Sequence, residues 1–445
     1  MTTVVPTQMI PGALANGVDS LKALTPERIK LKPVNQAQQY TKNGINKISF
    51  RLPSYSNSFL DTSKSFLTYT LGYTTPTTVN AVDCCSPINN ACPFDRLVVK
   101  TSSGLILDDV GGYNILTAMK SQMLPLGNYM NDLEGRTSVS MESGVHSPDY
   151  SIRREFKDVG IQYRHQVQAG VLSATTAKWI PVGMCDGGAG YAFDLDLYLG
   201  ETSGVIKQFG SVTTPEYFVK DVIFHLELRR ADESLCKRFS EVACDGDKEI
   251  LIPFSTMHHH QHSLSSPGQN LVRIHESASN LKRIFNVHLL ATDLSTLALQ
   301  RAYGFLGLKG IVNKFNCRVG SKWMYSEPIE TSTELIMHLK NSLGMSDVPL
   351  WLEQISTGTI TGGPAHFSFA DTIKSVSCVD FGYSNEKFLD GINSNTPVEF
   401  HLYTRPSYVS GEIMSHFFSE LNYNLSIRQG QVTYTEPKPG VGFVY

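Results

Sequence analysis

The hexapeptide MHHHQH at residues 257–262 carries the side chains with the greatest potential for chemistry. If this stretch is a strand, His258, His260 and His262 share one face and His259 lies on the other, because side chains alternate across a strand. Imidazoles bind metal ions and titrate near neutral pH, so a metal site or a pH-sensitive interface would suit the spacing. No acidic or cysteine ligand lies nearby in the sequence. We therefore expect a packed or solvated polar strand and no metal site.

Two pairs of carboxylates are the next candidates. Asp194 and Asp196 alternate on the polar face of an expected strand. Asp108 and Asp109 stand together just before a pair of glycines. Paired carboxylates can perform glycoside hydrolysis, and carboxylates beside glycines can bind calcium. We expect the first pair to be solvated or to contact another subunit, and the second pair to belong to a turn.

The remaining motifs indicate packing more than chemistry. Trp323, Tyr325 and Tyr403 could form a platform for a sugar, but such rings are expected in a core or an interface. Glycine clusters at 185–190 and 304–310 lack the strand–turn–helix context of a phosphate-binding loop. The sequence contains no G-x-S-x-G or H-E-x-x-H motif. It therefore predicts no catalytic, cofactor-binding or metal-binding residue, and a protein that is not an enzyme.

Length and charge set limits on the class of protein. A chain of 445 residues is too long for one ordinary core, and about two domains are expected. The net charge of -3 lacks the basic excess of a protein that wraps nucleic acid, so direct packaging of a genome by this chain is not expected. Charged residues make up only 18% of the chain. A surface poor in charge and rich in Ser, Thr, Asn and Tyr suggests that partners cover much of it.

Cysteine usage and the N-terminus indicate a compartment. No CxxC spacing is present, so the cysteines are expected to be reduced and structural. The N-terminus lacks a signal peptide, and no stretch approaches the ~20 apolar residues of a membrane span. We expect a soluble product of a reducing cytosol, in which the glycosylation sequon at Asn424 is unused. The eight cysteines are Cys84, Cys85, Cys92, Cys185, Cys236, Cys244, Cys317 and Cys378.

The tract 190–229 gives the clearest sign of the elements that position these residues. Its first part alternates apolar and polar residues over 193–199, and its last part does so over 222–229. Such period-2 patterning predicts half-buried antiparallel strands. A long connection separates the two, which favours a Greek-key or jelly-roll crossing over a tight hairpin.

The same order of elements occurs in both halves of the chain. Strand, strand, hairpin, helix, loop and strands follow one another twice, with helices expected at 114–124 and 331–343. A further short helix is expected at 411–419, followed by a terminal hairpin that turns at Gln429–Gly430. Residues 1–44 contain four prolines and little periodicity, which indicates an extended, mildly basic arm with at most one short helix over 20–30, broken by Pro26. Two tandem β-barrels, 45–240 and 241–445, are the simplest account of the all-β pattern.

Several tracts resemble those of double jelly-roll major capsid proteins of small icosahedral DNA viruses, and within that family the polinton-like and adintovirus types. FRLPSYSNSFLDTSKSFLTYTL at 50–71 has the shape of the entry strands of a first barrel. FDRLVVKTSSGLILDDVGGYNIL at 94–116 resembles the hairpin and helix start that follow. EILIPFSTMHHHQH, NLKRIFNVHLLA and CRVGSKWMYSEPI resemble the start of a second barrel. The likeness covers roughly 48–430.

The resemblance implies a structural role without catalysis. It implies a homotrimeric capsomer of pseudo-hexagonal outline, in which six similar barrels stand perpendicular to an icosahedral shell around a DNA genome. Neighbouring capsomers, penton proteins and minor capsid proteins would be the partners, the virion would be the location, and assembly would occur inside the host cell. Sequence-specific binding of nucleic acid is not implied, and whether a membrane lies under the shell is left open.

Two other interpretations remain open at this point. A carbohydrate-binding or carbohydrate-processing β-sandwich would suit the aromatic and carboxylate residues, but the expected secretion signal is missing. A single jelly-roll shell domain with a projecting domain would also explain the β pattern. The matching order of elements in the two halves favours two similar barrels over both.

Overall fold

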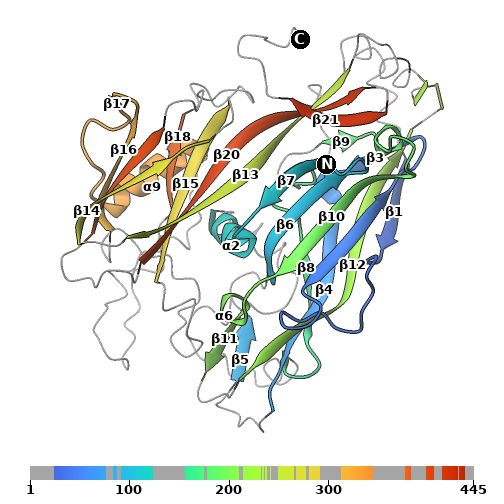
Figure 1. Ribbon diagram of the computed structural model, residues 1–445, viewed down its shortest axis with the longest axis horizontal. Helices are drawn as coiled ribbons and strands as arrows, with labels where there is room; N and C mark the ends of the chain where they lie inside the picture. Colours follow the sequence, from blue (N-terminus) through green and yellow to red (C-terminus); the bar gives the residue numbers. More distant parts are fainter. Residues whose placement is uncertain are drawn as a thin grey trace.

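The strands of the chain pair in two separate groups (Figure 1). Within the residues described by the computed structural model, strands up to Arg230 pair only with one another, and so do the strands from Ile250 onward. All pairings between named strands are antiparallel. The structure describes residues 25–76, 84–87, 92–123, 156–174, 178–209, 214–231, 233–234, 236–237, 241, 249–264, 267–276, 280–290, 312–343, 376–381, 397–404, 413–428 and 430–435.

The first barrel consists of two facing sheets, which we call 1A and 1B, and a small extra sheet. In sheet 1A the order is β8-β4-β12-β1, and β3 and β9 continue the sheet beside the end of β12. In sheet 1B the order is β2-β10-β6-β7. The strands of sheet 1A are β1 Thr25–Leu31, β3 Ser58–Asp61, β4 Phe66–Thr74, β8 Ile161–His165, β9 Trp179–Ile180 and β12 Glu216–Arg230. Those of sheet 1B are β2 Lys47–Pro53, β6 Phe94–Thr101, β7 Ile106–Val110 and β10 Tyr191–Leu199, while β5 Cys84–Pro87 pairs with β11 Ile206–Phe209.

The second barrel repeats this plan. Sheet 2A has the order β13-β20-β15-β18, with β21 on β20, and sheet 2B has the order β14-β19-β16-β17. The strands of sheet 2A are β13 Ile250–Leu264, β15 Leu281–Leu290, β18 Ser377–Asp380, β20 Ile413–Arg428 and β21 Gln431–Thr435. Those of sheet 2B are β14 Gly268–Ile274, β16 Val312–Val319, β17 Lys322–Trp323 and β19 Val398–Thr404. The described helical segments are η3 Thr62–Lys64, α2 Tyr113–Met123, η4 Val182–Met184, α6 Thr202–Val205 and α9 Ser332–Leu343.

The two barrels correspond strand by strand. Nine elements of the first barrel have a counterpart in the second at the same place in the fold. The pairs, in chain order, are β1 and β13, β2 and β14, β4 and β15, β6 and β16, β7 and β17, α2 and α9, β8 and β18, β10 and β19, and β12 and β20. In each barrel one helix lies between the edge strand of one sheet and the edge strand of the other. Sheets 1A and 2A are therefore equivalent, as are sheets 1B and 2B. The sequence order predicted such a repeat of architecture, and the strand pairing bears it out.

The apolar faces of the paired sheets form the core. In the first barrel the alternating residues of β10 and β12 that point inward are fully buried, and Phe50 of sheet 1B meets Phe224 of sheet 1A edge to face, with ring centroids 5.8 Å apart. In the second barrel Phe400 of sheet 2B meets Phe417 of sheet 2A, with centroids 4.9 Å apart. The prediction that the strands of the tract 190–229 do not form a hairpin is confirmed, because β10 lies in sheet 1B and β12 in sheet 1A.

Two predicted helices are wrong. The stretch 411–419 lies largely in strand β20, and the segment from Thr25 to Leu31 forms strand β1, paired with β12 from Arg230 to Phe224. The apolar residues of β20 resemble a helical stripe because the strand is buried on both faces, which removes the alternation that marks a half-buried strand. The arm expected over 1–44 is therefore wrong for 25–31, which belong to the first barrel. Residues 1–24 lie outside the described residues.

Candidate functional site: the barrel junction and the open barrel faces

The edges of sheets 1B and 2A meet where the two barrels join (Figure 1). β7 is an edge strand of the first barrel, β13 is an edge strand of the second, and the two are in contact. The Gly170 N–H donates a hydrogen bond to the Ser255 carbonyl on β13, at 3.1 Å. A backbone contact of this kind satisfies part of an otherwise open strand edge. The junction is therefore held by main-chain as well as side-chain contacts.

Ionisable groups are buried in this junction. The Asp108 carboxylate accepts a hydrogen bond from the Val171 N–H at 2.7 Å and lies so close to Gly170 that a Cβ there would be 2.3 Å from it. Lys178, which is fully buried, donates to the Gly170 carbonyl at 3.1 Å. Burial lowers the pKa of Lys178 to about 7 although Asp108 opposes the shift, and burial raises the pKa of Asp108. The prediction that Asp108 and Asp109 form a turn is wrong, since both lie in strand β7.

A second buried lysine belongs to the helix at the junction. Lys120 of α2 donates to the Gln168 carbonyl at 2.5 Å. Burial lowers its pKa to about 8, while Glu420 of β20 acts in the opposite direction and Arg283 of β15 adds to the lowering. Glu420 and Arg283 belong to the second barrel, so Lys120 lies within electrostatic range of the charged side chains on sheet 2A.

A stack of aromatic rings on sheet 2A completes the junction. His259 stacks on Phe418, with ring centroids 4.8 Å apart, and on His416, with centroids 5.2 Å apart. His259 Nε2 and His416 Nδ1 share a hydrogen bond of 3.0 Å. Gly112 of the first barrel lies directly against this stack, because a Cβ at Gly112 would be 2.8 Å from the His259 ring. Burial lowers the pKa of His259 to about 4 and that of His416 to about 3, so the stack is neutral at pH 7.

The other histidines of the MHHHQH tract point to the interior of the second barrel. His258 Nδ1 and His260 Nε2 lie 2.9 and 2.6 Å from the two carboxylate oxygens of Glu276. Burial alone would raise the pKa of Glu276, but the hydrogen bonds from the two histidines outweigh it and lower that pKa to about 2. Glu276 follows β14 in the facing sheet, far from the histidines in the sequence, so this partner was not predicted. The alternation of β14, continued past Ile274, is the one signal that points to it. Among the described residues no group of three or more His, Cys, Asp or Glu side chains has a geometry that could hold a metal ion.

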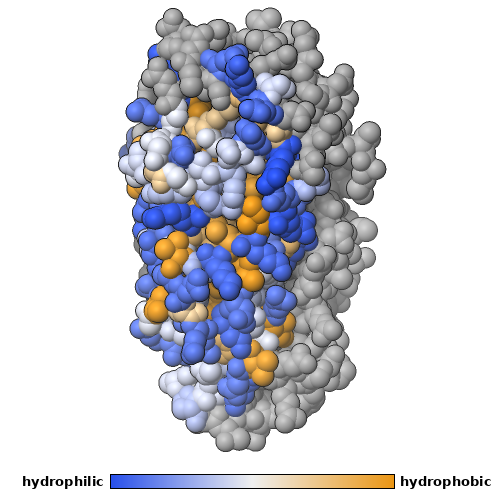
Figure 2. Space-filling model, turned by 90° about the vertical axis from the view of Figure 1, so that its right-hand side faces the viewer, coloured by the Kyte–Doolittle hydropathy of each residue, from blue (hydrophilic) through white to orange (hydrophobic). Residues whose placement is uncertain are grey.

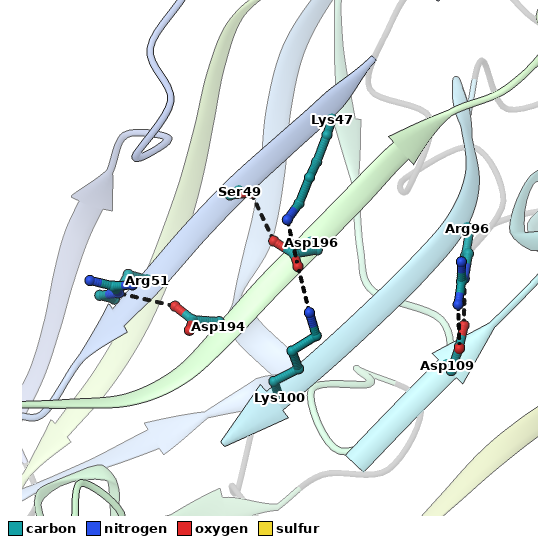
Figure 3. Close-up of polar contacts among 8 residues, drawn as sticks. All are labelled: Lys47, Ser49, Arg51, Arg96, Lys100, Asp109, Asp194 and Asp196. Carbon is teal, nitrogen blue, oxygen red and sulfur yellow. Dashed lines mark hydrogen bonds and ion pairs between the residues drawn. The ribbon is translucent and has the colours of Figure 1, made fainter. Parts of the chain in front are cut away.

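A ladder of ion pairs crosses the outer face of sheet 1B (Figure 3). Arg51 of β2 reaches Asp194 of β10 at 3.1 Å. Asp196, two residues on, lies 2.9 Å from the Lys47 ammonium and 3.3 Å from that of Lys100, and it also accepts a hydrogen bond from Ser49. Burial alone would raise the pKa of Asp196, but the bonds from these partners outweigh it and lower the pKa.

The ladder continues on the neighbouring strands and leaves little charge unpaired. Arg96 of β6 forms a bidentate pair with Asp109 of β7, at 2.7 and 2.5 Å. Lys47 and Arg96 also lie over the Tyr198 ring, each 5.7 Å from its centroid. The two aspartates considered for hydrolysis thus serve as cross-strand partners of cations. The expectation of a solvated pair is wrong for Asp196, which is buried beside its cations, whereas Asp194 is partly exposed.

The outer face of sheet 1A is arranged differently, with an excess of cations around one aromatic ring. His225 stacks on Phe66 with centroids 4.6 Å apart, and Arg164 lies over the same ring, 4.4 Å from its centroid. Arg28 lies 5.6 Å from it and pairs with Glu227 at 3.2 Å, and Lys30 stands opposite His225 in the strand register. Burial lowers the pKa of His225, and the nearby lysine and arginines lower it further. The side of the molecule that carries β1 is largely hydrophilic, with small separate hydrophobic patches (Figure 2).

Comparison with solved structures identifies this arrangement of sheets. A chain of the Sputnik virophage is similar with a TM-score of 0.59 and 11% identity, covering 94% of this chain and 92% of that one. A chain of the PBCV-1 virus capsid is similar with a TM-score of 0.53 and 10% identity, covering 93% and 97%. The mavirus major capsid protein is similar with a TM-score of 0.51 and 9% identity, covering 92% and 90%. All three have two jelly rolls in tandem. The fold is a double jelly roll.

The likeness concerns the fold of nearly the whole chain. No family model matches the sequence, and no curated protein matches it. The predicted double jelly roll is therefore confirmed by the similarity of the structures, although the sequence identities to the three chains are only 9–11%. No helix in the described part of the chain is long and apolar enough to cross a membrane.

The double jelly roll separates the aromatic residues considered as a sugar platform. Trp323 is 43% exposed on the outer side of sheet 2B, 4.8 Å from the His401 ring between centroids and 5.5 Å from the Arg318 guanidinium. Tyr325 instead packs edge to face against Phe315, with centroids 5.9 Å apart. The two rings therefore do not share one platform, and packing accounts for Tyr325 as expected.

Other residues singled out from the sequence have structural positions. The cluster at 185–190 forms a turn in which the Ala189 N–H donates to the Asp186 carbonyl at 2.8 Å. Asn424 is buried in β20, where a glycan has no room. The cluster at 304–310 and Cys244 lie outside the described residues. In the described part of the chain, the cysteines that are buried and form no disulfide are Cys85, Cys92, Cys185, Cys236, Cys317 and Cys378.

Proposed function

We propose that this chain is a viral major capsid protein, which assembles as trimeric capsomers of pseudo-hexagonal outline into an icosahedral shell around a DNA genome. One observation carries the proposal: the double jelly roll matches the mavirus major capsid protein and the chains of Sputnik and PBCV-1 over at least nine-tenths of both partners. Two equivalent barrels per chain also suit the task, because three copies then supply six similar building blocks around one axis.

The same proposal assigns the remaining roles. The protein acts by self-assembly and carries no catalytic residue, its place is the virion, and its partners are further copies of itself, neighbouring capsomers, and penton and minor capsid proteins. The chain divides near residue 240 into its two jelly rolls. Residues 1–24 lie on the inner side of the shell or tie neighbouring capsomers together.

Negative-stain electron microscopy of the purified chain, with light scattering to measure its mass, tests the proposal. Trimers with a hexagonal outline, or closed shells, are the expected result. A stable monomer across the micromolar range would contradict the proposal. Deletion of residues 2–24 tests the role of the arm separately: capsomers should still form, and shells should fail to close or should lose their regular size. Normal shells from the shortened chain would refute the role of the arm alone.

A further inference from the structure

Sheets 1A and 2A are equivalent in strand order, but their outer faces differ in how far the chain covers them. Part of the outer face of sheet 2A is covered within the chain, because Gly112 of the first barrel, which directly precedes α2, lies on its His259–Phe418 stack. The equivalent outer face of sheet 1A carries a similar stack, His225 on Phe66, but no part of the described chain covers it in the same way. Its Arg28 and Lys30 side chains are exposed. Within the described residues, one of the two equivalent surfaces therefore lacks its cover.

The correspondence between the two barrels also indicates which element of a barrel would cover the outer face of sheet 1A. In the first barrel the cover is the segment between β7 and α2, and the helix that follows carries Lys120 within electrostatic range of sheet 2A. In the second barrel the corresponding parts are residues 324–331 and α9. Glu327, Glu330 and Glu334 are exposed on these parts, and Met337 of α9 is 53% exposed. Among the described side chains this region thus presents three exposed acids and the apolar Met337, where the outer face of sheet 1A presents cations around the Phe66 ring.

The positions of the two surfaces fit a head-to-tail contact. β17 and α9 lie towards one end of the longest axis of the molecule, and β1 lies at the opposite end (Figure 1). Two different patches at opposite ends cannot meet within one chain, but they can meet between successive copies. A heterologous contact of this kind closes into a ring when the rotation between copies divides a full turn.

We propose that the outer face of sheet 1A, around Arg28, Lys30 and Phe66, is the docking surface for residues 324–331 and α9 of a second copy of this chain. The inference rests on the proposed capsomer and names the interface that closes it. Each contact between copies then repeats the contact that joins the two barrels within a copy. Three such contacts alternate with three internal junctions to give a ring of six barrels.

Charge complementarity supports this choice of partner. On sheet 1A, Arg28 has Glu227 as its acidic partner at 3.2 Å, while Arg164 stacks on Phe66. On the opposing surface Glu330 pairs with Lys314, and Glu334 is engaged by the backbone N–H groups at the start of α9. The exposed positions Lys30 and Glu327 are the ones we expect to pair across the interface. Charges of opposite sign on the two surfaces speed association and exclude pairing of like surfaces.

Charge reversal with rescue is the direct experiment. Lys30→Glu with Arg28→Gln makes sheet 1A acidic, and we expect the concentration for half-maximal trimer formation to rise about tenfold or more. Glu327→Lys with Glu330→Gln in the same chain restores opposite signs and should recover assembly. Lys237→Glu with Arg428→Gln changes the net charge equally at exposed positions away from both surfaces and is the control. Sedimentation analysis reads out the mass, and circular dichroism verifies the fold.

The outcomes separate this inference from the proposed function. Trimers of the unchanged chain that withstand the Lys30 and Arg28 reversal would overturn the interface and leave the capsomer in place. Monomers of the unchanged chain would overturn the capsomer itself. A second measurement needs no variant: zero-length carbodiimide coupling of the unchanged trimer should join Lys30 to Glu327 or Glu330 in a product of two-chain mass. Two-chain products that lack such a link would contradict the interface even if a variant failed to fold.

Discussion

Lowering the pH from 7 to 5 is expected to destabilise the second barrel through its buried histidines. His288 and His416 are buried and His259 is half-buried; burial lowers the pKa values of His259, His288 and His416 to about 4, about 4 and about 3, so all three are neutral in the fold at pH 7. In the unfolded chain the same imidazoles titrate near pH 6.5. Between these values the unfolded state binds protons that the folded state does not. Stability is therefore lost as the pH falls below about 6.5.

The size of the effect follows from the shift in pKa. For one histidine with a folded pKa of about 4, the linkage relation gives a loss of about 2 kcal/mol between pH 7 and pH 5. His259 and His416 share one hydrogen bond and influence each other, so their two contributions are not independent. A total loss of roughly 4–6 kcal/mol is expected for the three, which is a large part of the stability of a typical domain.

His288 provides the sharpest test because burial is the one cause of its shift. It lies on β15 with its Nδ1 2.7 Å from the Ser415 hydroxyl. His288→Asn keeps a polar group there but removes the proton-binding site, so the loss between pH 7 and pH 5 should shrink by about 2 kcal/mol. Urea unfolding at both pH values, with hydrogen exchange of β13, β15 and β20, measures the difference. The control is His275→Asn, which replaces an exposed histidine. An undiminished loss in the His288 variant would refute the reasoning.

Three further changes probe other parts of the structure. Gly112→Ala should lower the free energy of unfolding in urea by about 2 kcal/mol, because φ is 56° and the new Cβ would be 2.8 Å from the His259 ring. The control is Gly104→Ala, with φ of 87° and open surroundings, which should lower it by about 1 kcal/mol. Between pH 7.5 and 9 the unchanged chain should gain up to ~1.4 kcal/mol of stability per pH unit, because Lys178 keeps its proton in the unfolded chain and has lost it in the fold. Lys178→Met removes this titrating group, so the gain in stability should become smaller. Thr331→Ala removes the cap that accepts the N–H of Glu334 and should lower protection of α9 against hydrogen exchange by about 1 kcal/mol.

Half-buried strands and capped helices were predictable from local sequence. The alternation in β10 and β12 predicted two strands, and their separation predicted that they lie in different sheets, as they do. The capping box at Thr331 predicted the start of α9, where Thr331 and Glu334 exchange hydrogen bonds with each other's backbone. In each case the signal comes from residues within a few positions of each other. Such signals need no knowledge of what lies on the other side of the barrel.

Elements buried on both faces were not predictable in this way. β20 is buried on both faces, by the barrel interior on one side and at the barrel junction on the other, so its apolar residues follow no single period. The partners of the histidine tract were missed for a related reason. Glu276 reaches His258 and His260 from the facing sheet, and the buried Lys178 bonds the Gly170 carbonyl, whose own N–H bonds β13 of the other barrel. These contacts depend on long-range packing, which local patterns do not encode.

The chemistry of the two equivalent faces explains when each of them becomes covered. The stack on sheet 2A is neutral and dry, and His416 is 2% exposed, which suits a surface that its own chain covers during folding. The face of sheet 1A instead carries cations around Phe66, and these charges keep the face hydrated before a second copy binds. A neutral stack exposed there would favour non-specific association through its apolar rings. The cations favour a partner that carries acidic side chains at complementary positions. The difference between two faces of the same topology thus follows from whether the cover arrives in the same chain or in another copy.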